Sequence, residues 1–200
     1  MTASELLITG FEPFPGVPDN PTMRLVHSLA EAGDATLRGA RTLVLPTRYG
    51  HAPARLAQAL EPAPRVLIMT GYSRQATGPV IETRASNRCA ALVDAAGDLP
   101  TSPDDALHHR PAPCDAQALE KRLMRAGLRA ELSDDAGAYV CNHLYYNALE
   151  MVETRSLPTR ALFLHLPALV GTPLAKHSAG EMALHEMQQA LGIIADELLR

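Results

Sequence analysis

The segment that decides the fold reads Arg65-Val66-Leu67-Ile68-Met69-Thr70-Gly71. Its four consecutive apolar residues show no polar alternation, which is typical of a strand covered on both faces, and the final glycine indicates a turn. Further strands are expected, three of the same kind at residues 6–10, 41–46 and 162–167, and two weaker ones at residues 79–85 and 128–132. The chain therefore contains a series of short strands, most of them buried.

Amphipathic stretches alternate with these strands. Asn20 precedes Pro21, a pair typical of an N-cap and a first helical residue, and Asp115 can cap a helix that ends near Gly127. The expected helices cover residues 20–29, 50–60, 115–127 and 141–153, and a last one carries Met182, Leu184, Met187, Leu191 and Ile194. This order predicts one α/β domain over residues 1–200, with a twisted, mainly parallel sheet sandwiched between helices.

One stretch departs from the alternation. Residues 94–114 contain four prolines and the pair His108-His109, and we expect them to form a long surface loop. No role follows from the sequence for the two histidines. In α/β folds, ligands bind beyond the carboxyl ends of the strands, so the candidate residues are those that follow or end a strand.

Composition limits the classes of function. The chain has 200 residues, 46% hydrophobic and 20% charged, as expected for an ordinary globular domain. A net charge of −4 argues against a nucleic-acid partner. The longest apolar run, residues 161–170, is about half as long as a membrane-spanning helix. The first residues do not resemble a signal peptide, and three cysteines suit a reducing compartment, so we expect a cytoplasmic protein without membrane contact.

Cys141 is the best candidate nucleophile. It follows the turn-forming segment Asp135-Ala136-Gly137-Ala138-Tyr139-Val140, and an amphipathic helix begins at or just after it. A thiol at a helix N-terminus feels the positive end of the helix dipole, which favours the thiolate, and the first backbone N–H groups point at any oxyanion formed by attack. The alternative is a small, inert core residue. Cys89 and Cys114 lie in polar or proline-rich segments without this geometry.

A cysteine nucleophile requires a base and a group that orients the base. His165 interrupts an apolar strand near its carboxyl end, where α/β sites form, although a satisfied core histidine fits the same position. Glu82 interrupts another strand-like stretch and could hold the imidazole of His165 in its working tautomer. The alternative for Glu82 is a surface ion pair with Arg84.

A metal-dependent hydrolase is the alternative hypothesis for the function. His177, Glu181 and His185 follow at intervals of four residues, which would place them on one helix face, and two of them with a distant ligand could bind zinc. The HExxH spacing is absent, and a solvated helix face explains the same pattern. No phosphate-binding glycine loop and no GxSxG motif occurs, so neither nucleotide binding nor serine hydrolysis gains support.

Four segments together resemble pyroglutamyl peptidase type I, the pyrrolidone-carboxylate family of cysteine peptidases. The nucleophile block, residues 133–142, resembles the family's Ser–x–x–Ala–Gly–x–Tyr/Phe–Val–Cys–Asn motif. The other matching segments are Thr9-Gly10-Phe11-Glu12-Pro13-Phe14 followed by Asn20-Pro21, then Glu82-Thr83-Arg84-Ala85-Ser86-Asn87, and Phe163-Leu164-His165-Leu166-Pro167. The matches are spread over the whole chain.

The resemblance implies a Glu82–Cys141–His165 triad that removes an N-terminal pyroglutamyl group from peptides. It further implies a lactam-binding slot and substrate contacts formed by Phe11, Phe14, Asn20, Tyr72, Tyr139 and Val140. It also implies that no metal or cofactor takes part, that the protein is cytosolic, and that it forms a homotetramer. A non-catalytic lactam- or peptide-binding homologue is a further alternative.

The chain departs from the family's pattern near the expected substrate mouth. The family's Gly–Gly–Arg segment before the glutamate is replaced by Gln75-Ala76-Thr77, and the arginine is displaced to Arg74. Tyr72 stands where the family has Gln or Leu, and Leu92 stands where it has an arginine. We expect the segments 72–77 and 88–112 to alter specificity rather than the triad.

Overall fold

The computed structural model describes residues 5–29, 37–101 and 106–200. In this part of the chain, six strands form one sheet in the order β2-β1-β3-β8-β4-β7. Their bounds are β1 Leu6–Phe11, β2 Arg41–Leu45, β3 Val66–Tyr72, β4 Val80–Glu82, β7 Glu131–Ser133 and β8 Arg160–Leu166. The neighbouring pairs β2/β1, β1/β3 and β3/β8 are parallel. Strand β4 pairs antiparallel with β8 and parallel with β7. The sheet is therefore mainly parallel, as predicted, with its direction reversed at one edge.

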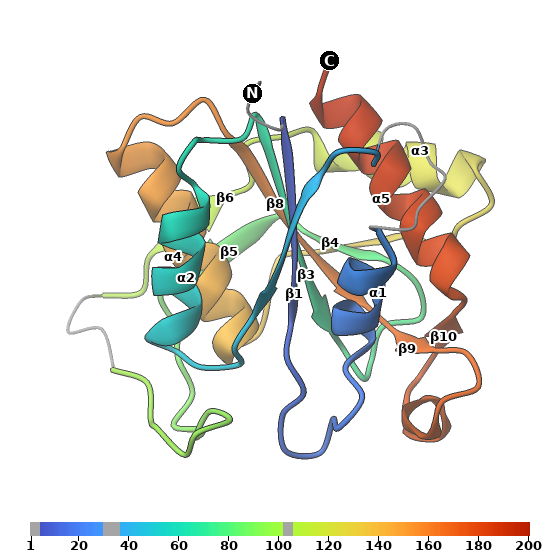
Figure 1. Cartoon of the computed structure of the whole chain (residues 1–200), viewed down its shortest axis with the longest axis horizontal. Coiled ribbons are helices and arrows are strands. Elements are labelled where there is room, and N and C mark those ends of the chain that lie inside the picture. Colours follow the sequence, from blue (N-terminus) through green and yellow to red (C-terminus); the bar gives the residue numbers. More distant parts are fainter. Residues whose placement is uncertain (1–4, 30–36, 102–105) are drawn as a thin grey trace.

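Helices cover both faces of this sheet (Figure 1). They are α1 Pro21–Leu29, α2 His51–Ala59, α3 Ala116–Arg125, α4 Val140–Thr154 and α5 Leu184–Leu198. The short elements are β5 Arg84–Ser86, β6 His109–Pro111, β9 Ala168–Leu169, β10 Glu181–Met182 and the 3₁₀ helix η1 Pro173–His177. Helices α2 and α4 lie on one face, while α1, α3 and α5 lie on the other. The predicted α/β/α sandwich is confirmed.

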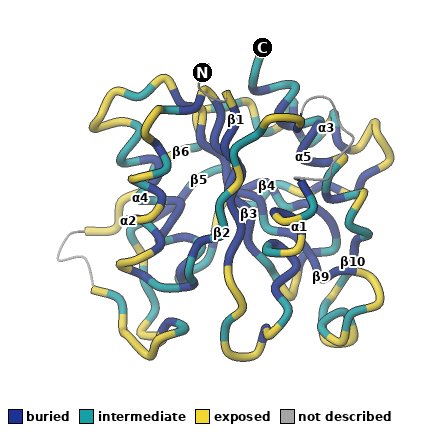
Figure 2. The backbone as a smooth tube through the Cα atoms, viewed as in Figure 1, coloured by how far each residue is buried: buried dark blue, intermediate teal, exposed yellow. Residues whose placement is uncertain are grey.

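Side-chain alternation along the strands explains the two layers. In β3, Val66 and Ile68 belong to the apolar cluster under α1, α3 and α5, whereas Leu67 and Met69 belong to the cluster under α2 and α4. All four are completely buried, and the central strands form the buried middle of the molecule in Figure 2. A strand covered on both faces has no polar alternation, which is the pattern seen in the sequence.

The structure corrects several expected boundaries. The strand expected at residues 79–85 is divided at Thr83 into β4 and β5, and β5 leaves the sheet to pair with β6. The strand expected at residues 128–132 lies at Glu131–Ser133. The helical spacing predicts that Met182 belongs to the last helix. This prediction is wrong, because Met182 lies in β10 and α5 begins at Leu184. A carboxylate oxygen of Glu186 accepts a hydrogen bond from the backbone N–H of Ala183 at 2.7 Å and marks this start.

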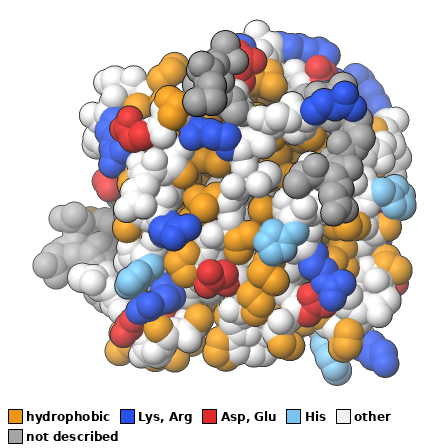
Figure 3. Space-filling view, viewed as in Figure 1, with side chains coloured by type: hydrophobic (Ala, Val, Ile, Leu, Met, Phe, Trp, Pro, Cys, Tyr) orange, Lys and Arg blue, Asp and Glu red, His pale blue; other side chains and the backbone are white. Residues whose placement is uncertain are grey.

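The stretch expected to be a long surface loop contains a strand. Within residues 94–114, β6 pairs with β5 in the antiparallel sense, while residues 102–105 lie outside the described part of the chain. No helix among the described residues is long and apolar enough to cross a membrane. On the face shown in Figure 3, basic and acidic side chains are interspersed rather than gathered into a patch of one sign.

Candidate active site

A cleft of about 550 Å³ contains the three residues that the sequence identifies as a nucleophile, a base and an orienting group. It is lined by Tyr72, Ser73, Arg74, Gln75, Ala76, Val80, Glu82, Glu131, Ser133, Asp135, Ala136, Gly137, Tyr139, Cys141 and His165. Gly71 is paired with His165 and Tyr72 with Leu166 where the parallel strands β3 and β8 end, and Cys141 in the first turn of α4 lies next to Gly71. The site therefore lies at the carboxyl ends of parallel strands, as expected for this class of fold.

The antiparallel pairing of β4 with β8 brings Glu82 to His165. Glu82 lies opposite Phe163, two residues from His165 on the same face of the sheet, which is within reach of a long side chain. The imidazole Nδ1 donates to the Glu82 carboxylate at 2.7 Å. The Glu82 side chain is only 2% exposed, and its second oxygen Oε2 has no hydrogen-bond partner among the described residues. A buried negative charge beside the ring favours the imidazolium form.

Cys141 lies in the first turn of α4, where the backbone donors of a helix have no partner within the helix. Gly137 has a φ of +85° and supports the turn before the helix, because glycine has no Cβ to clash in this conformation. Tyr139 is the N-cap residue, and its side chain makes no capping hydrogen bond. Since no side chain of the described residues caps the helix here, the N–H groups next to the thiol can bind an oxyanion.

The environment of His165 strongly raises its pKa. Burial alone lowers its pKa, but hydrogen bonds to Cys141 and Glu82, together with the charges of both, outweigh burial and raise the pKa to about 10. Since Nδ1 is engaged by Glu82, the remaining ring nitrogen, Nε2, is the one available to the thiol. At neutral pH this arrangement holds a protonated imidazole next to Cys141.

Gly71 is a residue of the site that the sequence patterns did not identify. It is paired with His165 across β3 and β8, so both positions face α4. A Cβ atom at Gly71 would lie 2.9 Å from Sγ of Cys141 and 2.9 Å from Cζ of Phe163, closer than real contacts allow. Glycine therefore lets the sulfur approach the backbone of β3. The signal in the sequence was a glycine within a strand, which often marks close approach of another group.

Asn142, next to the cysteine, attaches α4 to the segment that follows Glu82. Its side chain accepts from the N–H of Ser86 at 2.9 Å and donates to the carbonyls of Ser86 and Arg88 at 2.8 and 2.9 Å. Tyr145, one turn later, donates to the carbonyl of Glu82 at 3.3 Å. Helix α4 thus fixes the position of Glu82 relative to Cys141. The sequence reading assigned no role to either side chain.

The residues expected to form the lactam slot lie partly outside the cleft. Tyr72 and Tyr139 line it, whereas Phe11, Phe14 and Val140 are absent from its lining. Phe11 and Val140 are buried in the apolar cluster beneath α4. The rings of Phe14 and Tyr139 lie with centroids 6.2 Å apart, so Tyr139 connects the cleft to the loop after β1.

The remaining expected contact, Asn20, is 1% exposed and engaged within that loop. Its Oδ1 accepts from the N–H and hydroxyl of Thr22, and its Nδ2 donates to the carbonyl of Glu12 at 3.1 Å. These contacts cap α1 and hold the loop that carries Phe14. The hydroxyl of Tyr72 is also engaged, 2.7 Å from Oγ of Ser178.

A second cysteine–histidine pair lies near the cleft. Sγ of Cys89 is 3.6 Å from Nδ1 of His143, the residue two positions after Cys141. Burial raises the pKa of Cys89 and lowers the pKa of His143, so both groups are neutral near pH 7. Burial and the charge of Asp115 raise the pKa of Cys114 to about 11, against the opposite effect of Arg160. Neither thiol has the environment of a nucleophile.

The histidines of the rival metal site do not share a helix face, so the expected arrangement on one face is wrong and the metal-dependent alternative is not favoured. His177 lies in η1, Glu181 in β10 and His185 in α5. A spacing of four residues places side chains together only on a continuous helix, which the chain interrupts here. In the part of the chain that the structure describes, no three His, Cys, Asp or Glu side chains are grouped as metal ligands.

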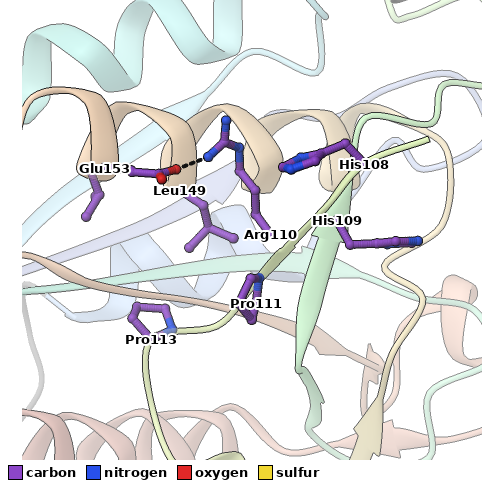
Figure 4. A pocket seen from close by; sticks show the side chains of 8 residues that line it. His108, His109, Arg110, Pro111, Pro113, Leu149 and Glu153 are labelled. Carbon is purple, nitrogen blue, oxygen red and sulfur yellow. Dashed lines mark hydrogen bonds and ion pairs between the residues drawn. The ribbon is translucent and has the colours of Figure 1, made fainter. Parts of the chain in front are cut away.

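Another cavity, of about 410 Å³, lies between β6 and α4 (Figure 4). His108 and His109 line it together with Pro111, Pro113 and Leu149. The only arginine in its lining, Arg110, is engaged by Glu150 and Glu153 and lies over the ring of Tyr146. Because Glu150 and Glu153 neutralise the Arg110 guanidinium, we assign no ligand to this cavity.

Comparisons with known proteins show which family the chain belongs to. Residues 4–199 match the family model described as pyroglutamyl peptidase. The pyrrolidone-carboxylate peptidase of Mycobacterium marinum is 33% identical, covering 96% of this chain and 90% of that protein, and the one of Streptococcus suis is 30% identical with 96% and 93% coverage.

Solved structures show the same similarity. Pyroglutamyl peptidase I of Bacillus amyloliquefaciens superposes with a TM-score of 0.82 at 28% identity, covering 96% of this chain and 95% of that one. The pyrrolidone carboxyl peptidase of Fervidobacterium islandicum gives 0.85 at 27% identity, with 98% and 99% coverage. The chain belongs to the pyroglutamyl peptidase family of cysteine peptidases.

Proposed function

We propose that the protein removes an N-terminal pyroglutamyl residue from peptides, with Cys141 as nucleophile, His165 as acid and base, and Glu82 as the group that orients His165. The observation that carries this proposal is the 2.7 Å contact between Glu82 and His165 in a cleft that also contains Cys141. Membership of the family supports the substrate class.

The reaction proceeds in two stages. The Cys141 thiolate attacks the pyroglutamyl carbonyl carbon, and the N–H groups at the start of α4 stabilise the resulting oxyanion. The carbon–nitrogen bond then breaks, and His165 gives its proton to the leaving amine. Water, deprotonated by His165, attacks the thioester, and the carbon–sulfur bond breaks to release pyroglutamate and restore the thiolate–imidazolium pair. Glu82 stabilises the imidazolium in both stages through its contact with Nδ1.

The lactam is small, flat and uncharged, so its slot should be apolar with an aromatic cover. We assign the cover to Phe14 and Tyr139, whose rings lie together, and the floor to Phe11 and Val140. Tyr72 forms a wall of the cleft beside Cys141. Asn20 acts indirectly, because its polar atoms hold the loop that carries Phe14.

The finer expectations belong to the same proposal. The protein acts in the cytoplasm, forms a homotetramer, and uses neither a metal nor a cofactor, as the resemblance of its motifs to the family implies. Hydrolysis by way of His177 and His185 is not proposed, since they lie in separate elements.

Release of a fluorophore from a pyroglutamyl amide tests the proposal. We expect turnover that resists EDTA, stops with iodoacetamide, and falls by at least about 10³-fold in Cys141→Ser, because the nucleophile is lost. The melting temperature should shift by less than about 3 °C, since 1 kcal/mol corresponds to about 2–4 °C in a domain of this size. Turnover that EDTA abolishes would overturn the thiol mechanism. Tight lactam binding without turnover in fully reduced protein would indicate a binding homologue.

A further inference from the structure

We infer that Arg74 binds a carboxylate on the leaving peptide, and that the enzyme favours substrates in which the residue after pyroglutamate bears one. The inference rests on the proposed function. The carboxylate is either the free C-terminus of a pyroglutamyl dipeptide or an acidic side chain at the second position. Arg74 lines the same cleft as Cys141 and His165.

We assign most of the cleft to the leaving group, because three of the four residues assigned to the lactam slot do not line it. Its lining comes mainly from residues 72–76, at and just after the end of β3, and from β7 and the turn before α4. Of the residues assigned to the lactam slot, Tyr139 lines the cleft, whereas Phe11, Phe14 and Val140 do not. His165, which protonates the leaving amine, does line the cleft, so the chain beyond the scissile bond is adjacent to these polar residues.

The backbone of Arg74 is fixed while its side chain is free. Its carbonyl accepts from the N–H of Ala179 at 2.8 Å, and the nearby Tyr72 hydroxyl lies 2.7 Å from Oγ of Ser178. The two segments pack closely, because a Cβ atom at Gly180 would lie 2.6 Å from Cα of Thr77. The backbone of Arg74 is thus fixed beside the cleft, while its guanidinium is free to turn toward a bound peptide.

Arg74 differs from the acidic residues Asp135 and Glu131 of the cleft, because each of those carboxylates has a bonding partner. Asp135 pairs with Arg88 at 2.6 Å, and that pair and a backbone hydrogen bond lower the pKa of Asp135 against the effect of burial. Glu131 accepts a hydrogen bond from the hydroxyl of Thr77 at 2.9 Å. The exposed guanidinium of Arg74 has no ion-pair or hydrogen-bond partner among the described residues. A planar guanidinium recognises a carboxylate through two parallel hydrogen bonds.

Two matched substrate pairs test this inference. The first is pyroglutamyl-alanine against pyroglutamyl-alanine amide, and the second is pyroglutamyl-glutamate amide against pyroglutamyl-glutamine amide. In at least one pair, kcat/KM of the intact enzyme should favour the carboxylate by about two- to fivefold, as for an exposed ion pair. The pair that shows the preference identifies the source of the carboxylate, and added salt should reduce it.

Arg74→Gln should bring that ratio to about one, mainly through KM, because the contact is the same in the bound substrate and the transition state. Arg74→Lys should retain part of the preference. Arg55→Gln, which removes an exposed arginine of α2 outside the cleft, should retain all of it. A preference that is absent in the intact enzyme, or that survives in Arg74→Gln, overturns the inference. Failure to cleave all four substrates would instead overturn the proposed function, and the inference with it.

Discussion

His165 is the residue on which the chemistry of the cleft depends most. It is 12% exposed, donates through Nδ1 to Glu82 at 2.7 Å, and is left with one ring nitrogen for Cys141. Its raised pKa means that the proton for the leaving amine is already present at neutral pH. The acid step therefore depends on Glu82 keeping the imidazole charged.

The pH profile of activity reports on this dependence. With the pKa of His165 raised to about 10, kcat/KM should fall on the alkaline side near that value, as the acid loses its proton. In Glu82→Gln the fall should move to lower pH, because the negative charge is removed. Rates of pyroglutamyl amide cleavage from about pH 7 to 11 measure the shift. An identical alkaline limb in both proteins would contradict the role of Glu82.

The same shift has a consequence for stability. The folded-state pKa of His165 lies above the unfolded value of about 6.5. Its contribution to the free energy of unfolding is therefore fully present below that value and is lost as pH rises through about 10. Denaturation in urea over this range should show a decline that is smaller in Glu82→Gln.

Gly71 tests how closely the sulfur must be held. In Gly71→Ala the new methyl group would lie 2.9 Å from Sγ of Cys141, so the thiol or β3 must move. We expect kcat/KM to fall by about 10–100-fold, the range that a displacement near 1 Å produces. The control is Gly50→Ala, since a Cβ there meets nothing within 4 Å. Equal activity of the two variants would show that the contact is unimportant.

At the scale of elements, α4 organises the site. Its first residues carry the nucleophile, and Asn142 and Tyr145 attach it to the strands that hold Glu82. Because Glu82 and Cys141 are far apart in the sequence, this connection determines whether the two ends of the proposed triad meet.

Asn142→Ala removes the connection to β5. The N–H of Ser86 would lose its acceptor in a buried position, so the free energy of unfolding should drop by about 1–3 kcal/mol and activity should fall with it. Urea denaturation and the amide assay measure the two effects. Asn147→Ala is the control, because among the described residues the Asn147 side chain donates only to the carbonyl of His143 within the same helix. If both variants unfolded alike, the connection would not contribute.

Sequence patterns predicted these elements unequally. The apolar runs predicted β1, β3 and β8, because strands buried on both faces need no polar residues. The run at residues 41–46 also predicted β2, but its expected burial is wrong: β2 is an edge strand in which only Leu45 is buried. The sequence did not predict the reversed direction of β4, because an apolar run does not indicate in which direction a strand runs. The antiparallel pairing of β4 with β8 is nevertheless what brings Glu82 to His165. The spacing of His177 and His185 predicted one continuous helix, which is wrong. Periodicity cannot show that β10 lies between the two histidines.

On the scale of the whole molecule, exposed apolar side chains gather in one stretch of sequence. Leu92, Val93, Leu99 and Leu107 are each more than half exposed. Such residues are costly in a monomer when they form a patch and are typical of interfaces. They fall in the segment 88–112, where the chain departs from the family's pattern.

We expect the homotetramer implied by the resemblance to use this stretch. Sedimentation of the intact protein should give the mass of four chains, and Leu99→Ser combined with Leu107→Ser should lower it. The substitution Met124→Ser removes an exposed apolar side chain on α3 and is the control. A single-chain mass for the unaltered protein at all concentrations would contradict the expectation.

The central claim is that Cys141 is the nucleophile, and parallel alkylation and activity measurements test it most directly. The folded protein is treated with limiting iodoacetamide, and mass spectrometry follows each of the three cysteines while pyroglutamyl amide cleavage is assayed. Cys141 should be modified at the rate at which activity is lost. Cys89 and Cys114, whose pKa values are raised, should stay largely unmodified over that time. Loss of activity with Cys141 intact, or full activity with Cys141 alkylated, would contradict the account.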